Sequence, residues 1–195
     1  MINNKGFTLV ELLAMLVVLG ILMGIAIPNI SGILTNNKLN VMKADANKMV
    51  DTASMKFSKL TRNQRPKDNE CLVYALNYLN DSGDINTGPN GGEYLQFDSF
   101  IVISRESHAA GEGDSFRYYI RLVERKNSKY LGMNFVERSS LSQGATNLTG
   151  EITVPADQQL SSDKQESLDA LSRIPKIQEL CSAGVIDYYP GKVLN

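Results

Sequence analysis

The sequence predicts an α+β protein, with one long N-terminal helix followed by a small head that contains an antiparallel sheet of about four strands. Three observations support this prediction. Residues 12–27 contain no polar side chain, apolar residues recur at helical spacing between residues 39 and 60, and segments that alternate apolar and polar residues occur only after residue 90. A chain of 195 residues has room for one such domain and an extension.

The composition excludes several classes of functional site. The chain has one histidine, His108, and two cysteines, Cys71 and Cys181. Two cysteines cannot build a four-thiolate zinc site or a cysteine-ligated iron–sulfur cluster within one chain, and a single histidine argues against a His-based metalloenzyme. We therefore expect no metal and no cofactor. A net charge of −1 does not point to any class of partner.

The first predicted element is a helix from Phe7 to about Arg62. A helix needs about 20 mostly apolar residues to cross a bilayer, and residues 7–34 exceed this length with Glu11 as their only charged residue. Farther on, the pattern changes to one apolar stripe, which consists of Leu39, Met42, Ala46, Met49, Ala53, Phe57 and Leu60. Pro66 ends the helix, because it disfavours helical backbone at the residue before it. We expect residues 7–34 to be a membrane anchor, and residues 35–66 to cover the sheet of a head formed by residues 67–195.

The start of the chain carries a more specific signal. Residues 5–13 read Lys5-Gly6-Phe7-Thr8-Leu9-Val10-Glu11-Leu12-Leu13. They combine a short basic leader that ends in glycine, an apolar residue after it, and a glutamate five positions beyond the glycine. A long apolar run follows. This segment resembles the N-terminus of a type IV pilin precursor, and the resemblance covers roughly residues 1–60.

The resemblance implies a processing route and a structural, non-enzymatic function. A prepilin peptidase would cleave between Gly6 and Phe7, removing the leader of residues 1–6, and the Phe7 amine would then be methylated. The mature chain would be a single-pass membrane protein of a bacterium. An inner-membrane assembly platform would then build it, with other pilin subunits, into a surface filament. The expected fold is the ladle shape of pilins. Thr8 and Glu11 are the expected assembly residues. The argument is strongest for Glu11, because a charge within a membrane helix is costly and usually marks a function.

Two other functions fit part of this pattern. A pseudopilin of a type II secretion or DNA-uptake machine has the same N-terminus. A membrane-anchored extracytoplasmic enzyme or binding domain would explain the apolar helix but would give no role to Glu11. No pattern in the sequence bears on nucleic-acid binding.

Gly20, Gly24 and Pro28 follow one another at spacings of four within the apolar run. Small residues at this spacing let membrane helices pack closely, and Pro28 lacks an N–H and clashes with the carbonyl of Gly24. One interpretation is that the helix only tolerates these residues. The resemblance to pilins implies another, in which this segment loses helical structure and lets a filament subunit stretch.

Within the head, the sequence predicts a helix at residues 71–79, a loop at 80–92 and strands near 95–103, 116–122, 131–135 and 151–155. A tight turn at Lys126-Asn127 would join the second strand to the third. Ser162 and Gln165 form a capping-box pattern for a helix. Pro175 either breaks that helix or opens a second one.

Other features of the head allow alternatives. Cys71 and Cys181 either form a disulfide, which an extracytoplasmic compartment would allow, or remain two buried thiols. Many pilins close a C-terminal loop with a disulfide, although usually a much shorter loop. Asp81, Asp84 and Asn86 form a weak candidate for a Ca²⁺ site, since Ca²⁺ takes oxygen ligands. Their spacing is not that of an EF-hand, and a polar turn is the favoured interpretation. Gly91-Gly92 does not open a helix and therefore does not predict a phosphate cradle.

Charge is segregated along the chain. Residues 38–67 carry eight basic residues against Asp45 and Asp51, and residues 68–195 carry 11 basic and 18 acidic residues. These two regions could attract one another between copies, or they could be two solvated faces, since exposed charge pairs contribute only about 0–1 kcal/mol each.

Overall fold

A computed structural model describes residues 8–105, 115–142 and 149–191 of the 195-residue chain, without the side chains of residues 23–33. The chain divides into two compact units, Met1–Lys38 and Leu39–Asn195. The first helix, α1 (Leu9–Ser58), contributes residues to both units.

In the N-terminal unit, α1 begins at Leu9, two residues later than predicted. The side chains of residues 8–22 are exposed, with Leu9 at 79% and Val10 at 74%, so the apolar residues among them have no cover within their own unit. Across the part of the chain that the structure describes, no helix is both long and apolar enough to qualify as a membrane span. Of the three residues predicted to loosen the helix, Gly24 and Pro28 lie outside the described side chains.

In the head unit, α1 presents the predicted apolar stripe to the core. Met42, Ala46, Met49, Ala53 and Phe57 are buried, and Leu39 and Leu60 are half-buried against them. The helix ends at Ser58, four residues before the predicted end, and the short 3-10 helix η1 (Arg62–Gln64) follows. Arg65 donates from Nε to the carbonyl oxygen of Leu60 at 3.2 Å and from Nη2 to that of Ser58 at 3.4 Å. The Ser58 carbonyl is one of those that a helix leaves unpaired at its C-terminal end, and the Leu60 carbonyl follows it in the turn.

The head contains a sheet with more strands than predicted. Its seven strands are β1 (Glu70–Ala75), β2 (Glu93–Tyr94), β3 (Phe100–Arg105), β4 (Phe116–Lys126), β5 (Lys129–Glu137), β6 (Gly150–Glu151) and β7 (Gly184–Tyr189). The strand order is β6-β5-β4-β3-β1-β7, and β2 pairs with β4 beside this path. All pairs are antiparallel except β1 with β7, which is parallel. The α+β class is therefore confirmed, and the prediction of about four strands is wrong.

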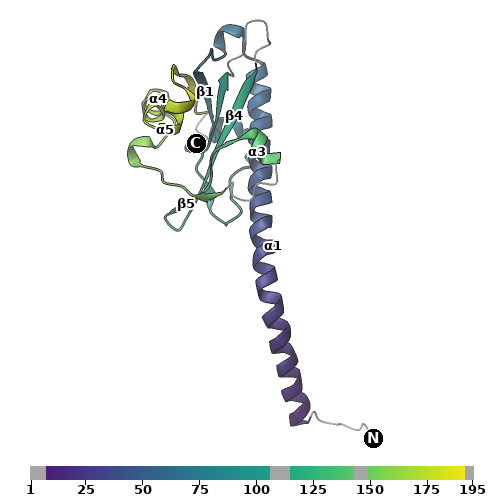
Figure 1. Cartoon of the computed structure of the whole chain (residues 1–195). Coiled ribbons are helices and arrows are strands. Elements are labelled where there is room, and N and C mark those ends of the chain that lie inside the picture. The colour runs from purple at the N-terminus through teal and green to yellow at the C-terminus, as the bar shows by residue number, and fades with distance from the viewer. Residues whose placement is uncertain (1–7, 106–114, 143–148, 192–195) are drawn as a thin grey trace. The chain divides into compact units, whose positions relative to one another are not determined.

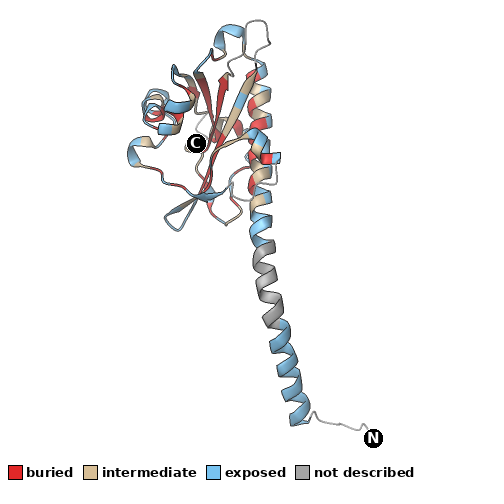
Figure 2. Cartoon of the chain, in the orientation of Figure 1, coloured by how far each residue is buried: buried red, intermediate tan, exposed pale blue. Residues whose placement is uncertain are grey.

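Helices cover both faces of this sheet (Figure 1). The head part of α1 packs on one face, together with the short helix α2 (Leu76–Leu79). On the other face, α4 (Lys164–Ser172) and α5 (Pro175–Leu180) pack against β1, β3 and β7. Two further short elements, α3 (Arg138–Ser142) and η2 (Ala156–Gln158), lie in the connections. Buried residues are concentrated on the strands and on the side of α1 that faces them (Figure 2).

The largest error of the prediction concerns residues 71–79, which were expected to be helical. Residues 70–75 form β1, and only Leu76–Leu79 form a helix. Because β1 lies inside the sheet and both faces are covered, every residue from Cys71 to Ala75 is buried. Such a strand reads as a continuous apolar run without alternation, which resembles a buried helix. The sequence analysis expected only residues 35–66 to cover the sheet, and so it did not predict burial on both faces.

Other local predictions agree with the structure more closely. The turn after Lys126 joins β4 to β5 as a two-residue hairpin loop, in which Asn127 and Ser128 have φ values of +48° and +62°. Pro175 opens α5 as its first residue. The N-cap of α4 is Asp163 rather than Ser162, and its Oδ1 accepts from the N–H of Glu166 at 2.8 Å.

The predicted first and fourth strands have different bounds. Of the region near 95–103, only the part from Phe100 onward is a strand, β3, and β2 ends just before the region at Tyr94. The predicted strand at 151–155 is reduced to β6. β7 was not predicted, because it is an edge strand of mixed burial that begins with a glycine at φ +103°.

Both edges of the sheet are short or modified. The β6 edge has only two residues. On β7, Ile186 is an extra residue between the pairs Cys71–Val185 and Leu72–Asp187, which makes a bulge. The carboxylate of Asp187 accepts from the backbone N–H of Tyr188 at 2.8 Å, and Lys164 forms an ion pair with the same carboxylate.

Candidate functional site

The first turn of α1 is a capping box formed by Thr8 and Glu11, the two predicted assembly residues. Oε2 of Glu11 accepts from the backbone N–H of Thr8 at 2.9 Å and from its hydroxyl at 2.8 Å. The Thr8 hydroxyl oxygen accepts from the N–H of Glu11 at 3.3 Å. This reciprocal arrangement satisfies donors that a helix leaves free at its start. Among the described residues, no donor contacts Oε1 of Glu11, so this exposed oxygen remains available.

The spacing Thr8-x-x-Glu11 is itself the sequence pattern of a capping box, so this contact could have been recognised from the sequence. The predicted processing residues Gly6 and Phe7 lie outside the described residues. At Gly20, an added Cβ would meet no atom of the described chain within 4 Å. Its role in helix flexibility therefore stays a prediction, as do the roles of Gly24 and Pro28.

Cys71 and Cys181 form a disulfide, which decides between the two alternatives left open by the sequence. Cys71 lies in β1, and Cys181 is the residue that ends α5. Their Cα atoms are 5.4 Å apart, and 110 positions of sequence separate them. Both residues are buried. The bond therefore fastens the layer of α4 and α5 to the interior of the sheet.

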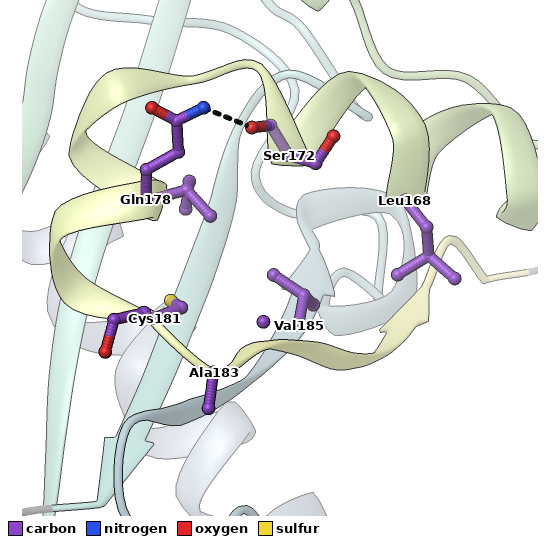
Figure 3. A pocket seen from close by; sticks show the side chains of 9 residues that line it. Leu168, Ser172, Gln178, Cys181, Ala183 and Val185 are labelled. Carbon is purple, nitrogen blue, oxygen red and sulfur yellow. Dashed lines mark hydrogen bonds between the residues drawn. The ribbon is translucent and has the colours of Figure 1, made fainter.

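A pocket of about 360 Å³ lies beside Cys181, between α4, α5 and the start of β7 (Figure 3). Leu168, Ile177 and Val185 form much of its wall. Gln178 donates from Nε2 to the carbonyl oxygen of Ser172 at 2.7 Å and so holds the two helices together at its rim. None of the residues that line this pocket is charged, so it offers no group for acid–base chemistry.

The side chains of the weak calcium candidate are engaged within the chain. Oδ2 of Asp84 accepts from Nζ of Lys48 at 2.6 Å, and Oδ2 of Asp81 lies 2.8 Å from Nζ of Lys56. Asn86 donates from Nδ2 to the carbonyl oxygen of Gly83 at 2.6 Å. In the described parts of the chain, no group of three or more His, Cys, Asp or Glu residues is placed to hold a metal ion. These residues fasten a polar loop to α1, and they use part of the positive charge of residues 38–67 within the chain itself.

The sequence analysis missed a fully buried carboxylate, Glu124 on β4. Its Oε1 accepts from the N–H of Gly92 at 2.7 Å, and its Oε2 accepts from the N–H and the Nδ2 of Asn90 at 3.3 Å and 2.9 Å. A Cβ added at Gly88 would lie 2.3 Å from Cδ of Glu124. The loop of residues 88–92 therefore wraps a carboxylate of its own chain, and we call this arrangement the Glu124 cradle. The run Gly-Pro-Asn-Gly-Gly signals the loop, but its distant partner has no local signature.

A second buried charge, Arg121, lies on the sheet face that carries α4 and α5. Its side chain is 3% exposed, and its guanidinium carbon lies 5.7 Å from the ring centroids of both Phe100 and Phe135. Within the described residues, Nε and Nη2 have no hydrogen-bond partner. Burial lowers the pKa of Arg121, which the charge of Asp98 opposes, and burial raises the pKa of the Asp98 carboxyl.

A family model, the prokaryotic N-terminal methylation motif, matches residues 1–27. This motif is the leader signature of type IV pilin and pseudopilin precursors, so the recognition made from residues 5–13 is confirmed. The motif marks a pilin-like structural protein and not a known enzyme family. No curated protein and no solved structure matches the chain. The match ends before the head begins, and the capping box of Thr8 and Glu11 lies inside it.

Proposed function

We propose that this pilin-like precursor becomes a structural subunit of a type IV pilus. A prepilin peptidase cleaves it between Gly6 and Phe7 and methylates the Phe7 amine, and an inner-membrane assembly platform polymerises it into a surface filament. The observation that carries the proposal is the methylation motif at residues 1–27, which opens into α1 and is followed by a separate, disulfide-linked head.

The exposed apolar side chains of residues 9–22 support this proposal. A helix satisfies its own backbone hydrogen bonds and can therefore lie in lipid, where its apolar side chains avoid water. We propose that residues 7–34 anchor the precursor in this way as a single membrane span. In a filament, the same side chains would be covered by neighbouring copies. The subunit could then leave the membrane without exposing its apolar surface to water.

The two oxygens of Glu11 suggest how copies find their register. Oε2 is occupied by the cap on Thr8, whereas Oε1 is available. Cleavage would place a positive amine on Phe7. An unpaired charge in an apolar filament core is strongly disfavoured, so we propose that Oε1 accepts from the Phe7 amine of a neighbouring copy. One carboxylate would then start its own helix and set the axial position of the next subunit.

The processing step can be tested directly. N-terminal sequencing of the mature protein from its own host should begin at Phe7. Gly6→Leu should leave uncleaved precursor in the membrane, because a bulky side chain obstructs the peptidase at the position where glycine has none. A mature protein that begins at Met1 or Ile2 would contradict the cleavage.

The assembly role needs variants that separate the cap from the contact between copies. Glu11→Gln keeps an acceptor for the cap but loses the charge, and Thr8→Ala removes the cap hydroxyl but keeps the charge. With each variant expressed as the only copy, we expect Glu11→Gln to be cleaved normally and nearly absent from the sheared-fibre fraction. Thr8→Ala should still assemble. The reverse order would show that Glu11 acts only as a cap.

The same fibre preparation separates a pilin from a pseudopilin, since the methylation motif is shared by both. A pilus subunit should be abundant in long sheared fibres, and its deletion should remove those fibres. A deletion that impairs protein secretion or DNA uptake while the surface fibres persist would favour a pseudopilin.

A further inference from the structure

The Glu124 cradle contains the only Asn-Gly pair in the sequence, Asn90-Gly91. Asparagine before glycine is prone to deamidation, because glycine has no side chain to hinder attack by its backbone nitrogen on the asparagine side chain. In this protein, both partners of that reaction are held by hydrogen bonds to other groups. The Asn90-Gly91 sequence therefore favours deamidation, whereas the hydrogen bonds of the folded loop oppose it.

We propose that Asn90 is a deamidation site, that the folded Glu124 cradle holds it unreactive, and that its reaction opens the cradle irreversibly. The proposal concerns the head alone and does not depend on the pilus function.

The reaction balances with water as the only added reactant. The backbone nitrogen of Gly91 loses its proton and bonds to Cγ of Asn90, while the bond from Cγ to Nδ2 breaks and ammonia leaves. Water then adds to either carbonyl of the five-membered imide. The products are aspartate, or isoaspartate in which the main chain runs through the former side chain.

Three bonds oppose the first step in the folded protein. The nitrogen of Gly91, which must attack, donates its proton to the carbonyl oxygen of Gly88 at 3.0 Å. The side-chain amide of Asn90 donates to Glu124 at 2.9 Å, and its backbone N–H donates to the same oxygen at 3.3 Å. Asn90 must release Glu124 before its side chain can turn toward Gly91. The rate in the folded state should therefore follow the opening of the loop.

The product cannot re-form the hydrogen bond that the Asn90 side chain donates to Glu124. An aspartate at position 90 would place a second carboxylate where Nδ2 now lies, 2.9 Å from a buried oxygen of Glu124. Two carboxylates at this distance cannot both be charged without a large penalty. Lys126, an exposed residue, donates to the backbone oxygen of Asn90. Isoaspartate would also lengthen the loop, which the bond from Gly88 N to Gly92 O now closes at 2.9 Å.

The test is peptide mass mapping of the purified full chain in detergent, incubated at neutral pH either folded or in urea with the disulfide reduced. We expect Asn90 to deamidate at least about tenfold more slowly in the folded protein. Asn127-Ser128, in an exposed two-residue turn, is the internal reference and should change much less between the two conditions. Glu124→Gln should raise the folded-state rate at Asn90. Equal rates at Asn90 in folded and unfolded protein would overturn the proposal.

The consequence of the reaction has its own measurement. Asn90→Asp mimics one product, and Asn90→Ala removes the same hydrogen bond without adding charge. In urea unfolding, Asn90→Asp should have a lower midpoint than Asn90→Ala, because only the former opposes Glu124. A midpoint for Asn90→Asp equal to that of the wild type would show that the cradle accepts the product, and the claim of irreversible opening would be wrong.

Discussion

Reducing the Cys71–Cys181 disulfide should lower the free energy of unfolding of the head by about 5 kcal/mol. The bond closes a loop of 110 residues. In the chain-entropy model, breaking such a loop returns entropy to the unfolded chain worth about 5 kcal/mol at room temperature. A whole domain is typically stable by only about 5–15 kcal/mol, so the reduced head should be close to unfolding.

The measurement is urea unfolding followed by far-ultraviolet circular dichroism, since the chain has no tryptophan. Oxidised wild type is compared with reduced wild type, which keeps every side chain, and with the double variant Cys71→Ala/Cys181→Ala, which also loses packing. Because the freed unfolded chain exposes more surface, the urea dependence should become steeper on reduction. A reduced protein within about 1 kcal/mol of the oxidised one, with an unchanged slope, would refute the argument from loop entropy.

Three further predictions concern the head. The fragment Leu39–Asn195 should be soluble and unfold cooperatively, because the core lies within this unit; aggregation without a thermal transition would contradict its independence. Arg121→Met should change the free energy of unfolding by less than about 2 kcal/mol, because removing two buried nitrogens that have no hydrogen-bond partner among the described residues offsets the lost attraction to Asp98; a larger decrease in urea unfolding would show that the attraction to Asp98 dominates. Burial raises the pKa of Asp98 from its ordinary value of 3.8, against the hydrogen bond from Leu160 and the charge of Arg121, so the folded state binds this proton more tightly. The free energy of unfolding should therefore fall as the pH rises from about this value through the raised pKa, and Asp98→Asn should remove that decline in urea titrations across the range; a decline of equal size in the variant would disprove the assignment.

Elements with a clear local period could be predicted from the sequence. The stripe of α1 has apolar residues every three or four positions, and β4 and β5 alternate around a turn whose two residues both have positive φ values. β1 could not be recognised in this way, because burial on both faces removes the alternation that identifies a strand. The residues of β1 and of its parallel partner β7 that pair with one another, such as Glu70 with Gly184, are at least 114 positions apart in sequence, so no local pattern links the two strands.

The candidate sites also differ in whether their residues are close together or far apart in the sequence. The leader motif and the pair of Thr8 and Glu11 are close in sequence, and their spacing alone identifies them. The Glu124 cradle joins residues 32–34 positions apart, and the ion pairs of Asp81 and Asp84 reach back to α1. A glycine-rich loop or an acidic turn in the sequence does not show which side chain will occupy it. Tertiary packing supplied those partners.

The short and bulged edges of the sheet have a consequence for how copies of the head could meet. Open strand edges held side by side act as templates for cross-β growth, and such growth is practically irreversible. Here Asp187 already occupies the Tyr188 N–H, a bulge bends β7, and the β6 edge is only two residues long. These features disfavour pairing of β7 or β6 with a strand of a neighbouring copy, so contacts between heads are expected to be made mainly by side chains. Where copies of the head do meet, contacts made by side chains can be broken without unfolding either partner.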